Sequence, residues 1–144
     1  MTNVSRTFVV EAAPDVVIDY LKDFSHAEAW DPGTESCTRL DDGEIAVGSQ
    51  WHNTSTIAGV STELVYELTE LRADSVTFVG ENDTAKTTDV ITATPHGTGT
   101  ELTYDATIEM KGAAKLGAPA VKVIFEKVGN DTEDDLTRVL NQLA

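Results

Sequence analysis

The spacing of apolar residues near the end of the chain predicts a long amphipathic helix between Gly112 and Ala144, either continuous or divided at Pro119. Apolar residues recur there at helical intervals, at Val121, Ile124, Phe125, Val128, Leu136, Val139, Leu140 and Leu143. The stripe is interrupted over residues 129–135, where Gly129 and Thr132 stand at positions that large side chains should fill. Two explanations are open: a kink or surface break, or a helix that is thin here because something else occupies the space.

Between residues 34 and 110 the chain is rich in Thr and Val and is cut by turn residues at regular intervals, which is typical of antiparallel strands. Six strands are predicted, at 34–40, 49–57, 61–71, 75–80, 85–94 and 100–110, and Gly59 should close a tight hairpin. The last strand alternates most regularly, with Leu102, Tyr104, Ala106, Ile108 and Met110 on one face. Such alternation indicates one dry face and one wet face.

The start of the chain adds a strand over 3–11, a short helix over 14–23 and a second short helix that ends after Trp30. Ser25 and Glu28 have the spacing of a capping box for this second helix. The order of elements predicts an α+β protein in which a curved, seven-stranded antiparallel sheet wraps around the long C-terminal helix. A helix is about 10 Å across, so the concave face needs either more side chains or a cavity.

Composition narrows the possible functions. The 144 residues are expected to form one domain, and 10 basic against 25 acidic residues give a net charge of −15. The chain therefore lacks the basic face that nucleic acids or anionic membranes require. No apolar stretch approaches the length of a membrane span, and a single cysteine, Cys37, cannot form an internal disulfide. We expect a cytoplasmic protein with no nucleic-acid partner and no integral membrane association.

Few residues suggest catalysis, and no metal, phosphate-loop or nucleophile motif is present, so we expect neither a metal nor another cofactor. His52 should face water if Trp51 and its same-face neighbours point inward. Asp89 alternates with Ile91 and Ala93 and would have a raised pKa if that face is buried, although the opposite register would leave it in water. The weak catalytic candidates are therefore Asp89, Tyr104 and His52. Arg6 either pairs with a buried acid or ligand carboxylate or is exposed.

Several local sequences, in this order, resemble the START-like (SRPBCC) superfamily and within it the polyketide cyclase/dehydrase-like family. They are residues 12–17 (AAPDVV), 23–24 (DF), 30–33 (WDPG), 47–49 (VGS), 67–71 (ELTEL) and 97–104 (GTGTELTY), followed by Gly112, Pro119, Phe125, Leu136 and Leu140. The resemblance runs along residues 1–144 and implies a helix-grip fold with an apolar cavity between the sheet and the last helix.

The resemblance also implies a small hydrophobic or amphipathic ligand, such as a lipid, a polyketide or an aromatic metabolite. We expect it to be bound, in a monomer or homodimer, by Phe24, Trp30, Trp51, Tyr66, Phe78, Ile91, Tyr104, Ile108, Ile124 and Val128. Two alternatives are open: a cyclase or dehydratase that uses the same cavity, and a protein-interaction module with a filled core and an exposed apolar patch.

Overall fold

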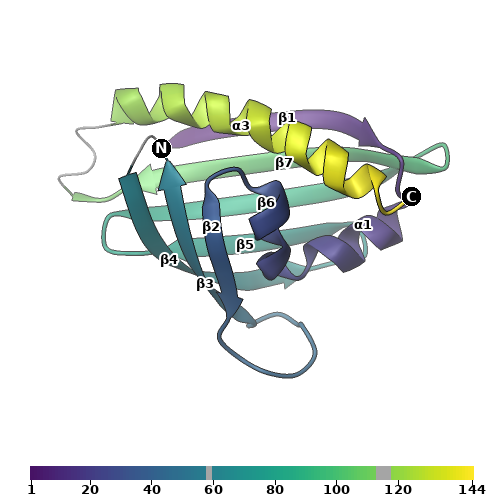
Figure 1. Ribbon diagram of the computed structural model, residues 1–144, viewed down its shortest axis with the longest axis horizontal. Coiled ribbons are helices and arrows are strands. Elements are labelled where there is room, and N and C mark those ends of the chain that lie inside the picture. The colour runs from purple at the N-terminus through teal and green to yellow at the C-terminus, as the bar shows by residue number, and fades with distance from the viewer. Residues whose placement is uncertain (58–59, 113–117) are drawn as a thin grey trace.

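The computed structural model describes residues 1–57, 60–112 and 118–144 (Figure 1). Its elements in chain order are β1 (Thr2–Val10), α1 (Pro14–Leu21), the 3-10 turn η1 (Phe24–His26), α2 (Ala27–Trp30), β2 (Thr34–Arg39), β3 (Gln50–Ile57), β4 (Val60–Leu71), β5 (Ser75–Glu81), β6 (Ala85–His96), β7 (Gly99–Met110) and α3 (Ala118–Asn141). The predicted hairpin glycine, Gly59, and residues 113–117 of the predicted helix lie outside this description, as do the side chains of Ile57 and of residues 118–121.

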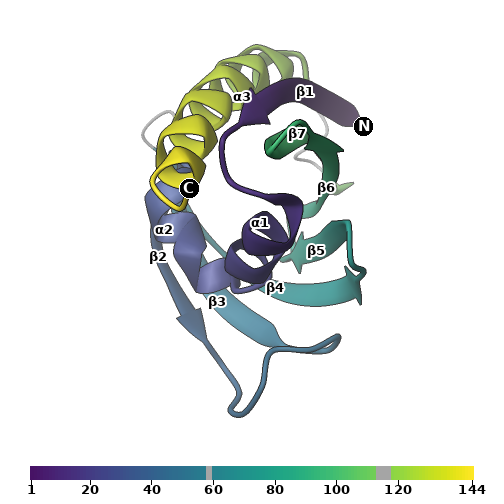
Figure 2. The same cartoon turned by 90° about the vertical axis from the view of Figure 1, so that its right-hand side faces the viewer.

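The seven strands form one antiparallel sheet in the order β1-β7-β6-β5-β4-β3-β2. Consecutive strands from β2 to β7 are neighbours, and β1 pairs with β7 from Thr2 opposite Ile108 to Val10 opposite Thr100. Figure 2 shows how the sheet curls: β2, at one edge, turns toward α3, and β1, at the other edge, lies next to α3. The arrangement confirms the predicted helix-grip architecture, with two short helices between the first two strands.

The first helices close one end of the curled sheet. Pro14 begins α1, whose Val17 and Leu21 are buried, and Figure 2 places this helix inside the curve beside the C-terminal end of α3. The predicted capping box is wrong. The carboxylate of Asp23 accepts the backbone N–H of Ser25 at 3.0 Å, and Glu28 instead accepts the backbone N–H of Cys37 at 2.8 Å. Asp23 is only two residues from Ser25, so its carboxylate takes the backbone N–H of Ser25 that Glu28 was expected to accept. The carboxylate of Glu28 then connects α2 to β2 through Cys37.

The long helix α3 packs against β1 and continues through residues 129–135 without a break. A Cβ atom added to Gly129 would lie 2.7 Å from Cγ2 of Val4, so the missing side chain is what lets β1 approach the helix. Thr132 is fully buried, and its hydroxyl donates to the carbonyl of Val128 at 2.8 Å. Of the two explanations for the interrupted stripe, the second holds, and the element that occupies the space is β1.

The interior at the α1 end of the sheet is filled by aromatic side chains. Phe24 lies 4.5 Å from Phe78 and 6.2 Å from Trp51, measured between ring centroids, and Trp30 meets Phe24 edge-on at 5.9 Å. All four rings are at most 1% exposed, and Leu21, Leu68, Ile91 and Leu102 complete this packing at 0%. We call this cluster the filled end.

None of the helices that the structure describes combines the length and the apolar character needed to cross a bilayer.

Candidate functional site

A cavity of about 360 Å³ lies between the first half of α3 and the concave face of the sheet. Its wall is largely apolar, and no residue of α1 contributes to it. The lining consists of Asp31, Ser55, Val60, Thr62, Leu64, Tyr66, Asn82, Thr84, Ala85, Thr87, Asp89, Tyr104, Ile108, Met110, Ile124, Phe125 and Val128. This volume is at the small end of the range for ligand pockets, so the space suits a compact molecule.

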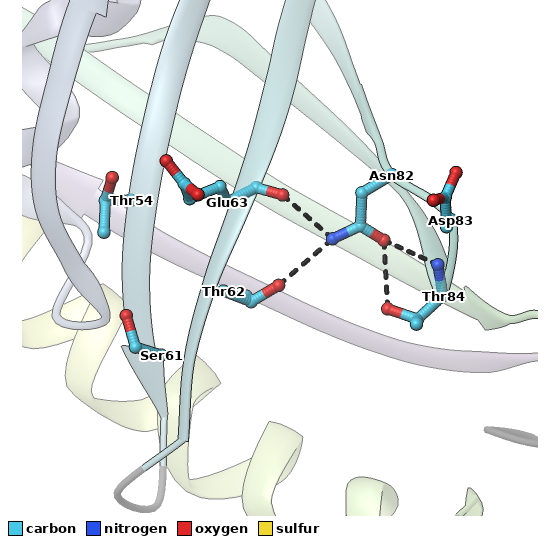
Figure 3. Close-up of a pocket in the computed structure, with 7 residues that line it drawn as sticks. All are labelled: Thr54, Ser61, Thr62, Glu63, Asn82, Asp83 and Thr84. Atoms are coloured by element: carbon cyan, nitrogen blue, oxygen red, sulfur yellow. Dashed lines mark hydrogen bonds between the residues drawn. The ribbon is translucent and has the colours of Figure 1, made fainter.

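A polar hollow on the surface adjoins this cavity and shares Thr62, Asn82 and Thr84 with it (Figure 3). The side chain of Asn82 lies between the start of β4 and Thr84 (Figure 3). Its Nδ2 donates to Oγ1 of Thr62 at 3.1 Å and to the carbonyl of Glu63 at 2.9 Å, while its Oδ1 accepts the backbone N–H of Thr84 at 2.8 Å. Asn82 therefore connects the β5–β6 turn to the start of β4 at the place where the polar surface meets the cavity.

Four polar side chains line the inner part of the cavity, and we call them the polar layer: Asp31, Tyr66, Asp89 and Tyr104. They stand between the filled end and the rest of the cavity, because Leu68 and Ile91 are the next inward residues toward the filled end on β4 and β6. On the side of α2, the polar layer is bounded by Trp30, whose ring lies 6.2 Å from the ring of Tyr104, measured between centroids.

The position of Tyr66 depends on a glycine of the neighbouring strand. Tyr66 stands opposite Gly80 in the register of β4 and β5, and a Cβ atom on Gly80 would lie 2.6 Å from the Tyr66 ring. The ring therefore lies flat across the glycine, and its hydroxyl accepts a hydrogen bond from Oγ1 of Thr87 at 3.1 Å. A residue with any side chain at position 80 would displace this member of the polar layer.

Asp89 is a strongly perturbed acid. It is 7% exposed, and its burial, together with the negative charges of Asp31 and Asp105, raises the pKa of its carboxyl group to about 8. A hydrogen bond from the hydroxyl of Tyr104 acts in the opposite direction and lowers this pKa. Asp89 therefore holds its proton at neutral pH in much of the population and can act as a donor, an acid or, once ionised, a base.

Asp31 is the second carboxylate of the cavity and is held by its own turn. Its Oδ2 accepts from Oγ1 of Thr34 at 2.8 Å and its Oδ1 accepts the backbone N–H of Gly33 at 3.3 Å. Burial raises the pKa of Asp31 and the charge of Asp135 adds to this, while the two hydrogen bonds lower it. Thr34 in turn accepts from Nδ2 of Asn53 at 3.1 Å, so the carboxylate is anchored to β3.

The two tyrosines stay protonated. Burial, followed by the charge of Asp89, raises the pKa of both Tyr66 and Tyr104 well above 10. Each phenol is therefore available to donate a hydrogen bond to a group in the cavity. Along the ranges that the structure describes, no three His, Cys, Asp or Glu side chains come together in a way that could hold a metal ion.

The structure divides the sequence-predicted ligand residues into two groups. Those that line the cavity are Tyr66, Tyr104, Ile108, Ile124 and Val128, and those that pack in the filled end instead are Phe24, Trp30, Trp51, Phe78 and Ile91. All of the strand residues point to the concave face, as their alternation predicts. The second group does not line the cavity because α1 and η1 bring their own apolar side chains against it, and alternation along a strand carries no information about which stretch is covered.

The catalytic candidates divide in the same way. Asp89 and Tyr104 face the cavity, so the inward register of Asp89 is the correct one. His52 lies on the outer face, where its Nε2 is 3.0 Å from a carboxylate oxygen of Glu63, and it cannot reach the cavity lining. Arg6 lies under α3 and pairs with Glu126 at 3.0 Å rather than with an acid of the cavity.

Sequence reasoning missed six polar residues of the cavity wall: Asp31, Ser55, Thr62, Asn82, Thr84 and Thr87. Asp31 follows Trp30 in the segment that is expected to end a short helix and that carries the WDPG motif, and Thr87 stands two residues before Asp89 on the same face of β6. The spacing of Thr87 was a usable signal, since residues two apart on a strand share a face. Nothing local to Asp31 indicates that its turn folds over the sheet.

The comparisons with known proteins agree with this architecture. The family model described as polyketide cyclase/dehydrase and lipid transport matches residues 1–144. A START superfamily protein from Mycobacterium smegmatis is similar in structure, with a TM-score of 0.83 at 20% identity over 100% of both chains. The Zhui aromatase/cyclase from Streptomyces sp. R1128 has a TM-score of 0.75 at 18% identity, over 98% of this chain and 92% of its own.

A STAR-related lipid transfer protein from Xanthomonas axonopodis is also similar, with a TM-score of 0.75 at 17% identity over 97% of this chain and 86% of its own. At these identities the likeness to the solved structures establishes the fold alone. None of the curated protein sequences matches the chain significantly. Because the family model matches it from the first residue to the last, the chain belongs to the polyketide cyclase/dehydrase and lipid transport family.

Proposed function

We propose that this protein binds a small hydrophobic or amphipathic molecule in the cavity between α3 and the sheet. The observation that carries the proposal is a largely apolar cavity wall that also carries a small group of buried polar side chains, the polar layer. Ile108, Ile124 and Val128 belong to the apolar part, and Asp89 and Tyr104 to the polar layer. An apolar pocket with a few convergent polar groups is the usual form of a small-molecule site. The family, whose description names lipid transport, supports the same function.

The test is to fill the cavity from one side of α3. In Ile124→Trp the larger side chain would occupy the space that the ligand needs, and Val123→Trp is the matched control because Val123 is 73% exposed on the outer side of the same helix. We expect a fatty alcohol such as decanol to raise the melting temperature of the wild type and of Val123→Trp, but not of Ile124→Trp. If no hydrophobic probe stabilises the wild type, or if both variants respond alike, the proposal fails.

Asp89 and Tyr104 give a specific reason to consider a second function, that of a cyclase or dehydratase acting on a polyketide-like chain. A carboxyl group with a pKa near 8 beside a protonated phenol is an acid–base pair inside an apolar cavity. Ionised Asp89 would take a proton from a carbon between two carbonyls, and Tyr104 would donate to the enolate oxygen. The enolate carbon would then form a bond to a second carbonyl carbon, and the proton on Asp89 would pass to the resulting alkoxide.

This second function has its own test. With a poly-β-ketone mimic as substrate, Asp89→Asn and Tyr104→Phe should each lower the rate of ring formation by about a hundredfold or more, because each removes one partner of the proton transfer. His52→Gln is the control, since His52 lies on the outer face and should leave the rate unchanged. Equal rates in wild type and Asp89→Asn would leave binding as the function of the cavity.

A further inference from the structure

The ionisable groups that line the cavity are all acids or phenols. Asp31 and Asp89 face it, and no Lys, Arg or His is among the described residues that form its wall. Two basic side chains from the surrounding elements are engaged elsewhere: Arg6 binds Glu126 and Asn130, and Lys111 binds Glu81. The cavity therefore contains two carboxylates and no cation from the protein's own described side chains.

Asp89 has unused capacity to accept hydrogen bonds. The one hydrogen bond that its carboxyl group receives from the described part of the chain comes from Tyr104. A carboxylate has about four acceptor positions, so most of those on Asp89 are open to a molecule in the cavity. The side chain is 7% exposed, and an ionised carboxylate in such a place is costly unless a positive charge or a proton accompanies it.

We infer that the ligand of this cavity is an amphiphile whose polar head is a protonated amine paired with Asp89, and that the cavity discriminates against fatty-acid carboxylates. The inference rests on the proposed function and names the ligand class for it. An ammonium group has three donors and a full positive charge, so it supplies what both carboxylates lack. The apolar wall formed by Ile108, Ile124 and Val128 accommodates the rest of the molecule.

The charge of the whole chain acts in the same direction. With 10 basic and 25 acidic residues, the net charge of −15 produces a field that favours the approach of cations and opposes that of anions. An anionic head would meet like charge from any ionised Asp31 or Asp89 in a poorly solvated space, and it would oppose the ionisation of both groups. A neutral hydroxyl head avoids this repulsion but gains no charge pairing.

The experiment compares decylamine, decanol and decanoic acid, which share one tail and differ in the head. Binding to the intact chain is measured by titration calorimetry at neutral pH, below the micelle threshold of each probe. We expect the amine to bind at least tenfold more tightly than the alcohol, about 1.4 kcal/mol, and the acid at least tenfold more weakly than the alcohol. Asp89→Asn should abolish the preference for the amine over decanol. Asp134→Asn is the control for net charge, since Asp134 is exposed on α3.

A pH series on the wild type provides a second measurement that needs no variant. The groups that face or influence Asp89 are Asp31 from the turn after α2, Tyr66 from β4, and Tyr104 and Asp105 from β7, while α3 presents the non-titrating Ile124, Phe125 and Val128. An ammonium head displaces the proton of Asp89, so the affinity for decylamine should rise by up to tenfold for each pH unit up to about pH 8. Decanol should show no such rise.

The outcomes separate the two claims. If none of the three probes binds, the proposed function and the inference both fail. If decanol binds but decanoic acid binds as tightly as the amine, or if the amine affinity is flat with pH, the cavity is a hydrophobic site and the inference is overturned. If Asp89→Asn is not folded, judged by circular dichroism, the pH series on the wild type decides alone.

Discussion

Replacing Asp89 by Asn should change how the stability of the protein depends on pH. In the folded state the pKa of Asp89 rises from an ordinary value of 3.8 to about 8, so the folded chain holds a proton that the unfolded chain releases over this range. The free energy of unfolding therefore falls as pH rises through that interval, because the native state binds more protons than the unfolded state. At about 1.4 kcal/mol for each pH unit, the full loss is about 6 kcal/mol, of which about 4 kcal/mol is already present at neutral pH.

Asn has nearly the shape of a protonated Asp and does not ionise. We therefore expect Asp89→Asn to have about the stability of the wild type near pH 4 and to be more stable by about 4 kcal/mol near pH 7, with no further gain above about pH 8. A small domain has about 5–15 kcal/mol in total, so this difference is large. Asp31 and Asp89 interact, so the measured slope belongs to the pair and not to Asp89 alone.

The assay is urea unfolding of both proteins at a series of pH values, followed by circular dichroism. The quantity of interest is the difference between the two free energies of unfolding, because acids that do not interact with Asp89 contribute equally to both proteins. Asp134→Asn, which changes an exposed acid of α3, should give a difference that does not vary with pH. A flat difference for Asp89→Asn, or a slope confined to the region below pH 5, would show that Asp89 is solvated and would refute the reasoning.

Three further substitutions test the packing around the site. Gly80→Ala should lower the free energy of unfolding by about 1–3 kcal/mol in urea, because its Cβ would lie 2.6 Å from the ring of Tyr66; an unchanged midpoint would contradict this. Gly129→Ala should also destabilise the protein in thermal unfolding, although alanine favours helices by about 1 kcal/mol, because β1 would be pushed away at Val4. His52→Gln should leave probe affinity unchanged in a fluorescence titration, and a loss of more than about tenfold would place the ligand elsewhere.

The fold could be predicted because its information is local. Alternation with period two determines which residues of a strand share a face, and Leu102, Tyr104 and Ala106 are all buried as their pattern predicts. The interruption of the apolar stripe on α3 was also visible in the sequence, since Gly129 and Thr132 stand where large apolar side chains are expected. What the sequence left open was the element that fills the gap, because the approach of β1 joins residues more than a hundred positions apart.

The site was predicted only in part, because a face of a strand is not the same as a cavity lining. Phe78 and Gly80 lie on the same face of β5, yet Phe78 is packed beneath Phe24 in the filled end and Gly80 carries the ring of Tyr66. The difference depends on where the first helices dock, which is a tertiary property. Asp31 was missed for the same reason: its local sequence explains a turn, and only the curl of the sheet brings that turn to the cavity.

The positions of the filled end, the polar layer and the solvent opening along the cavity determine the orientation in which a ligand of the proposed kind would lie. Toward α1 the space is closed by rings such as Phe24 and Phe78, which are fully buried, so no part of a ligand can pass beyond the polar layer. At the other limit the cavity opens to solvent, between Val60, which is 68% exposed, and the polar residues Thr62, Asn82 and Thr84. A head paired with Asp89 would therefore be the buried end of the ligand, and the apolar tail would be the end nearer the surface. Since buried polar groups accept few substitutes while apolar surfaces tolerate many, the site should be strict about the head and permissive about the tail.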